Sequence, residues 1–166
     1  MYDTPLTIDQ LLTQLAEQPK TIDALTAGLR RAQLNRSPIR EEWSANDVLG
    51  HLRSCGDVWG KYIAKIVAED RPTIRAMSPR TWIRSTNYPE QEFAPSFRAF
   101  TKQRADLLAL LRSLPEAAWS RSATVTGAGR PRKTTVLDYA RRLADHERSH
   151  VEQIARIVNR PSRRSA

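Results

Sequence analysis

Hydrophobic residues recur at steps of three and four along four stretches of the chain, the spacing that places them on one face of a helix. The stretches cover residues 6–30, 45–68, 91–113 and about 134–159. The pattern therefore predicts four amphipathic helices. Pro19 falls inside the first stretch, and a proline removes an amide donor from a helix interior. We expect the first helix to break there into two pieces.

Polar residues indicate where two of these helices begin. Ser44 precedes the second helix and Asp47 follows three residues later, a capping box with Asp in place of Glu. The fourth helix begins after Thr134 or Thr135, and Asp138 lies in its first turn, where the helix dipole favours an acid. Both helix starts are therefore predicted from local signals.

The connections between the helices differ in length. Residues 70–90 contain three prolines, which predicts a long connection, with a short helical turn near Trp82. Residues 119–134 are polar, and within them 122–126 fit a short strand or hairpin. Four main helices with one long crossover predict an all-α protein, a four-helix bundle with a long connection between helices two and three.

The bulk properties favour one domain. A chain of 166 residues can bury roughly 70% of its unfolded surface. We expect a single domain over residues 1–160 and a basic disordered tail over 161–166. No apolar run reaches the roughly 20 residues of a membrane span. The N-terminus lacks the blocks of a signal peptide, and the single cysteine, Cys55, has no partner within the chain. These features predict a cytoplasmic protein with no membrane contact.

The net charge of +9 comes from arginine-rich clusters. The clusters are Arg71, Arg75, Arg80 and Arg84; Arg121, Arg130, Arg132 and Lys133; and Arg160, Arg163 and Arg164. A positive field attracts nucleic acid or a small acidic substrate. The alternative is that the charge only keeps the protein soluble. Aromatic residues do not alternate with these arginines, and no nucleic-acid-binding motif is visible. A small-molecule partner is therefore favoured over nucleic acid.

The three histidines carry the strongest chemical signal. His146 and His150 lie four residues apart on the apolar stripe of the fourth helix, and His51 borders the stripe of the second. Side chains at i and i+4 lie about 5–6 Å apart, so two imidazoles can bind one ion. Three protein ligands leave a coordination position open, as in catalytic sites. The alternative is three ordinary core or surface imidazoles, but their pattern favours a divalent metal.

Three neighbours of the histidines have two interpretations each. Cys55, one turn after His51, is a fourth ligand or, as we favour, a small core residue. Glu147 is the general base of a His-Glu-x-x-His protease, a weak hypothesis because no further ligand follows, or it faces solvent beside Arg148. Gln153, one turn past His150, lines the pocket or forms a hydrogen bond to a ligand residue, or it is an interface or surface polar residue.

Three segments of the chain resemble the DinB-like superfamily of metalloenzymes. The resemblance lies in residues 43–52, with Trp43-Ser44 and the sequence around His51, and in residues 145–154, which contain both other histidines and then Gln-Ile. A weaker signal covers Phe100 to Leu108, and the whole likeness spans roughly residues 6–158. The superfamily includes thiol-dependent S-transferases and mycothiol-dependent maleylpyruvate isomerases.

The resemblance implies a four-helix bundle, a divalent metal on His51, His146 and His150, and a homodimer. We expect zinc or nickel at this site. A metal can lower the pKa of a bound thiol or water, so we expect a metal-dependent enzyme, a transferase that uses a low-molecular-weight thiol on a small, anionic substrate. Candidate substrate contacts are Arg84, Arg130 and Tyr88. The alternatives are a related hydrolase or isomerase, a basic bundle that binds nucleic acid with a structural metal or none, and a ligand-binding protein without turnover.

Overall fold

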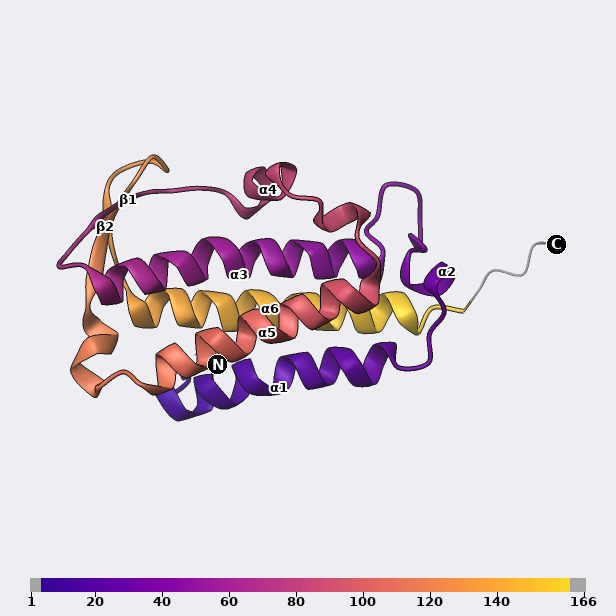
Figure 1. The fold of residues 1–166 in the computed structure, drawn as a ribbon, viewed down its shortest axis with the longest axis horizontal. Coiled ribbons are helices and arrows are strands. Elements are labelled where there is room, and N and C mark those ends of the chain that lie inside the picture. Colours follow the sequence, from indigo (N-terminus) through magenta and orange to yellow (C-terminus); the bar gives the residue numbers. More distant parts are fainter. Residues whose placement is uncertain (1–3, 162–166) are drawn as a thin grey trace.

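The computed structural model describes residues 4–161. Its four long helices form the predicted bundle (Figure 1): α1 (Ile8–Thr26), α3 (Ala45–Ala68), α5 (Phe93–Arg112) and α6 (Val136–Val158). The all-α four-helix fold and its long connection between the second and third of these helices are confirmed. The predicted basic tail, apart from Pro161, lies outside the described residues. None of the helices in residues 4–161 is long and apolar enough to cross a membrane.

Helix α1 is continuous, so the predicted break at Pro19 is wrong. Proline has no N–H to donate to the carbonyl oxygen of Leu15, four residues earlier. That oxygen instead accepts a hydrogen bond of 3.0 Å from Nη1 of Arg104, a residue of α5. The helix continues through Pro19 because a neighbouring helix supplies the missing donor.

The shorter elements lie in the connections. They are α2 (Arg31–Leu34), α4 (Pro79–Trp82), η1 (Ile83–Ser85), η2 (Tyr88–Glu90), η3 (Glu116–Ser120), β1 (Thr73–Arg75), β2 (Ser122–Thr126) and β3 (Arg132–Thr135). The predicted strand at 122–126 is present as β2, and it pairs antiparallel with β3, with Ala123 opposite Thr134. Strand β1, which pairs parallel with β2, was not predicted. The small sheet lies at one end of the bundle (Figure 1).

The capping box predicted at Ser44 is present, and Thr135 is the N-cap of the fourth long helix. The backbone N–H of Asp47 donates to Ser44 Oγ at 3.1 Å, and Asp47 Oδ2 accepts from the Ser44 N–H at 2.9 Å. Thr135 and Asp138 form the same reciprocal pair at the start of α6. These caps satisfy backbone donors that a helix start leaves free. They also fix where α3 and α6 begin, and with that the position of every histidine along its helix.

The long connection is tied to α3 along its length. Ser54 Oγ donates to the Pro79 carbonyl at 2.6 Å. The Asp57 carboxylate accepts from Trp82 Nε1 at 2.9 Å and from the Tyr88 hydroxyl at 2.6 Å. Helix α4 therefore packs on α3 at a fixed place, as Figure 1 shows.

A polar layer divides the bundle core into two apolar clusters. One cluster includes Leu15, Cys55, Leu107 and Ala144, and the other includes Ile22, Leu49, Phe100 and Val151. Between these members along the four helices lie polar residues that are buried or half-buried: Gln18, His51, Arg104, His146 and Glu147. Gln18 Nε2 donates to the Ala144 carbonyl at 2.8 Å. The candidate chemistry therefore lies in the middle of the bundle rather than at an end.

Candidate metal centre

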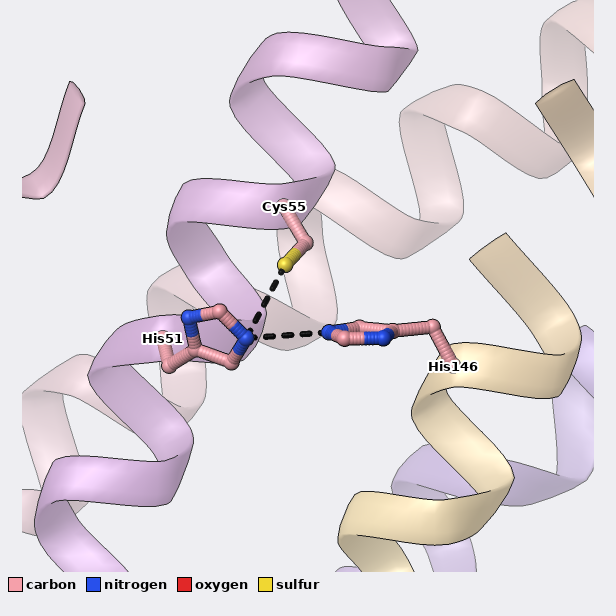
Figure 2. Close-up of side chains that lie close together, drawn as sticks. All are labelled: His51, Cys55 and His146. Atoms are coloured by element: carbon pink, nitrogen blue, oxygen red, sulfur yellow. Dashed lines mark hydrogen bonds between the residues drawn. The ribbon is translucent and has the colours of Figure 1, made fainter. Parts of the chain in front are cut away.

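The three histidines meet between α3 and α6. His51 Nε2 lies 2.9 Å from His146 Nε2, and His146 Nε2 lies 3.1 Å from His150 Nε2. The rings of His51 and His150 are 4.8 Å apart between centroids. Figure 2 shows His51 and His146 pointing toward one another from the two helices. The structure thus brings together all three residues that the sequence singled out.

These distances fit ligands of one ion. Two imidazole nitrogens at 2.0–2.1 Å from an ion are about 3.0 Å apart for a right angle at the ion and about 3.4 Å for a tetrahedral angle. The observed separations of 2.9 and 3.1 Å correspond to the smaller angle. Imidazole donors suit zinc, nickel, copper or iron. The chemistry of the donor set therefore fits a divalent metal.

The histidines are neutral at neutral pH. Burial, with the neighbouring histidines and the Arg80 charge adding to it, lowers the pKa of His51 to about 3. Burial and the charges around it lower the pKa of His146 to about 4, and burial also lowers the pKa of His150. A neutral imidazole keeps the lone pair that a metal needs. The site is therefore ready to bind an ion without first losing protons.

One side of the centre is open. His51 is buried, but His146 and His150 are half-buried, so the expectation that both histidines of α6 lie on the buried face holds only in part. His150 lines a pocket of about 490 Å³ together with Trp43, Arg80 and Gln153. A ligand in this pocket can therefore contact His150, the histidine that lines it.

Gln153 fixes the orientation of His150. Its Oε1 accepts a hydrogen bond of 2.7 Å from His150 Nδ1. With its proton held on Nδ1, the imidazole presents the Nε2 lone pair to the other histidines. Of the two interpretations of Gln153, the structure places it in this contact and in the wall of the pocket.

Two tryptophans enclose the histidines, and neither was a candidate from the sequence. The Trp43 ring lies 5.0 Å from the His51 ring and stacks on the His150 ring at 6.0 Å. The Trp59 ring meets the His146 ring edge-on at 5.1 Å. Trp59 follows His51 by about two helical turns on the same face, so spacing alone could have identified it.

Cys55 also lies against the cluster. Its Sγ is 3.5 Å from His51 Nε2, as Figure 2 shows. Burial, with the Glu147 charge adding to it, raises the pKa of this thiol to about 12, so the thiol keeps its proton. Within the described part of the chain, the donor atoms of His51, Cys55 and His146 lie within 4.8 Å of one another. Two donor sets therefore share His51 and His146, one completed by His150 and the other by Cys55.

Glu147 faces the bundle interior, so the solvent-facing interpretation is wrong. Its side chain is fully buried, and both carboxylate oxygens accept hydrogen bonds from the Arg104 guanidinium. Burial raises the pKa of Glu147, and Arg104 opposes that shift. Successive residues of a helix are rotated by about 100°. Since His146 points toward α3, the next residue, Glu147, points toward α5. A carboxylate held by arginine in this way is poorly placed to act as a protease base.

The three candidate substrate contacts lie elsewhere. Arg84 and Arg130 are exposed, and neither lines the pocket beside His150. The Tyr88 hydroxyl donates to Asp57, and the Arg53 guanidinium lies 3.7 Å from the centroid of its ring. The arginine that the long connection brings to the pocket is Arg80.

A four-helix bundle with a long second connection and three histidines between two facing helices defines a class of helical proteins with a candidate metal site. The chain belongs to the DinB superfamily, whose model matches residues 14–154. It is 26% identical over 160 residues to the Geobacillus kaustophilus (strain HTA426) protein named "Putative metal-dependent hydrolase GK0616", covering 92% of this chain and 85% of that protein.

A solved structure shows the same fold. YfiT from Bacillus subtilis, described as a probable metal-dependent hydrolase with an unusual four-helix bundle topology, matches with a TM-score of 0.78. The match covers 94% of this chain and 91% of YfiT, at 17% sequence identity. At that identity the similarity establishes the fold of the chain.

Proposed function

We propose that the chain is a metal-dependent enzyme in which His51, His146 and His150 hold a divalent ion, zinc or nickel. The observation that carries this proposal is the meeting of three neutral imidazoles through their Nε2 atoms beside an open pocket. When bound, such an ion lowers the pKa of a thiol or water next to it and leaves an anionic nucleophile at neutral pH.

The surrounding residues prepare this site. Gln153 holds the His150 ring in the orientation that presents Nε2. The Trp43 and Trp59 rings cover the histidines from two sides and limit the access of water. The pocket beside His150 measures about 490 Å³, whereas one water molecule occupies about 30 Å³ in the liquid. The space therefore suits an organic molecule next to the nucleophile.

The reaction we propose is transfer of a small thiol to a small, anionic substrate. The size of the pocket supports it, because a thiol cosubstrate needs more room than water. Hydrolysis is the second candidate, and the names of the Geobacillus kaustophilus and Bacillus subtilis proteins favour it. Incubation of the metal-loaded protein with an electrophilic substrate, with and without a thiol, separates the two reactions. Product formation that does not depend on the thiol would refute thiol transfer.

Metal content tests the site directly. We expect about one equivalent of a divalent ion in the purified, untagged protein and none in the variant that combines His51→Ala, His146→Ala and His150→Ala. Circular dichroism shows whether that variant keeps its helices. A matched control is Gln14→Ala, because Gln14 is a polar residue of α1 that bonds a backbone carbonyl of α6. Absence of metal in the folded wild type, even after reconstitution, would refute the proposal.

Three further predictions concern the oligomeric state, the location and the partner of the protein. They are a homodimer, a cytoplasmic location and a small-molecule partner rather than nucleic acid. Sedimentation equilibrium measures the first and fractionation of the source cells the second. For the third, binding to nucleic acid that falls steeply with salt would favour the alternative of a basic binding bundle.

A further inference from the structure

The pocket beside the histidines contains an arginine from the long connection. Arg80 lies in α4, and its guanidinium carbon is 5.3 Å from the centroid of the Trp43 ring. The same Trp43 ring stacks on His150. Arg80, Trp43 and His150 thus follow one another along the wall of a single pocket.

The position of Arg80 is fixed by hydrogen bonds to α3. Ser54 Oγ binds the carbonyl of Pro79, the residue before Arg80, and Ser54 is one turn after His51. Two residues beyond Arg80, the Trp82 indole donates to Asp57. Because the same helix carries both anchors and His51, α4 holds Arg80 in a set relation to the metal centre.

The Arg80 charge is available to a ligand. Within residues 4–161 its guanidinium lies over the Trp43 ring and its charge acts on the neighbouring histidines, but no carboxylate forms an ion pair with it. The pocket also contains Glu41 and Glu42, but Glu42 lies 3.6 Å from Arg160 and Arg156 adds a further positive charge. The cations in the pocket therefore outnumber the acids. A guanidinium binds a carboxylate through two parallel hydrogen bonds.

We propose that Arg80 binds a carboxylate of the molecule whose reactive atom meets the metal, and that it thereby selects anionic thiols or substrates over neutral ones. This inference rests on the proposed function, since it needs an ion on the histidines. It identifies a specificity-determining residue and the chemical class of its ligand. Arg84, one turn further along the connection and outside the pocket, is a matched control.

The experiment compares two thiols of similar size on the cobalt(II)-loaded protein. 3-Mercaptopropionate carries a carboxylate where 2-mercaptoethanol carries a hydroxyl. Binding of either thiol to cobalt produces a thiolate-to-metal charge-transfer band, which gives a Kd by titration without any turnover. We expect the wild type to bind 3-mercaptopropionate more tightly than 2-mercaptoethanol by about ten- to a hundredfold, the effect of a charge-assisted hydrogen bond.

In Arg80→Gln that preference should disappear, while the Kd for 2-mercaptoethanol stays within about twofold, a difference well below one tenfold step. Arg84→Gln should retain both wild-type values, and equal cobalt content would show that every variant keeps its site. Cobalt uptake with no band, or with the same preference in Arg80→Gln, would overturn this inference and leave the metal site in place. Failure to take up cobalt would instead overturn the proposed function, so the two failures are distinguishable.

Discussion

Replacing Arg104 with methionine should destabilise the protein more than any surface substitution. Arg104 and Glu147 form a buried ion pair between α5 and α6, with side chains 3% and 1% exposed. Removing one partner of a buried pair leaves an uncompensated charge and costs about 3–5 kcal/mol. The Leu15 carbonyl also loses its donor, which adds about 1 kcal/mol. Since small domains are stable by about 5–15 kcal/mol, a large fraction of the free energy of unfolding is lost.

Urea denaturation followed by circular dichroism measures this loss. The matched control is the double variant Arg104→Met with Glu147→Leu, which removes both charges and should recover most of the loss, because an apolar pair can replace a buried ion pair at little cost. A cost below about 1 kcal/mol for Arg104→Met would refute the reasoning, since values that small are typical of exposed ion pairs.

The contribution of the hydrogen bond from Arg104 to the Leu15 carbonyl can be isolated with Pro19→Ala. This change restores an N–H that can donate to the Leu15 carbonyl within α1. In that background Arg104→Met should cost about 1 kcal/mol less than in the wild type, the worth of one hydrogen bond. Equal costs in both backgrounds would mean that Arg104 does not replace the missing donor of Pro19.

The remaining predictions concern the proposed metal centre. Gln153→Leu should weaken metal affinity by about 10- to 100-fold in a chelator competition, because His150 loses the acceptor that orients it, whereas Gln153→Glu should retain most of it. In the metal-free protein the folded pKa of His51 is about 3 against an ordinary value of 6.5, so stability should be complete above pH 6.5 and fall as the pH drops below it. The slope from His51 is about 1.4 kcal/mol per pH unit, and His51→Gln should flatten the profile; a profile unchanged in that variant would contradict the assignment. Cys55→Ala should keep about one equivalent of metal if His150 completes the donor set, and loss of metal in that folded variant would identify Cys55 as the third ligand in its place.

Local signals in the sequence predicted the helices well. Capping boxes at Ser44 and Thr135 involve residues three positions apart, so they are readable before any fold is known. The predicted break at Pro19 failed because the group that replaces its amide is 89 residues away from Leu15. Strand β1 went unseen for a similar reason, since its three residues gain their conformation from pairing with β2. Contacts distant in sequence account for both errors.

In the candidate site, too, local sequence patterns were predictable and contacts between distant residues were not. The pair His146 and His150 is visible because i and i+4 share a helix face, and His51 because histidine is rare on an apolar stripe. Arg80 could not be ranked above Arg84, because the difference depends on how α4 docks. That docking is decided by hydrogen bonds from Ser54 and Asp57 to the connection. Several arginines in a long loop are equal candidates for a ligand contact until the hydrogen bonds that anchor the loop are known.

The buried ion pair and the histidine cluster are linked through α6. His146 faces α3 and the next residue, Glu147, faces α5, so the Arg104 contact sets how far α6 is rotated and shifted relative to its neighbours. An apolar core tolerates several packings of similar energy, whereas a bidentate ion pair is satisfied in one register. A shift of α6 by one residue would turn His146 away from His51 by about 100°. The Arg104–Glu147 pair in the polar layer therefore fixes the register of α6, and with it the distance between imidazoles on two separate helices.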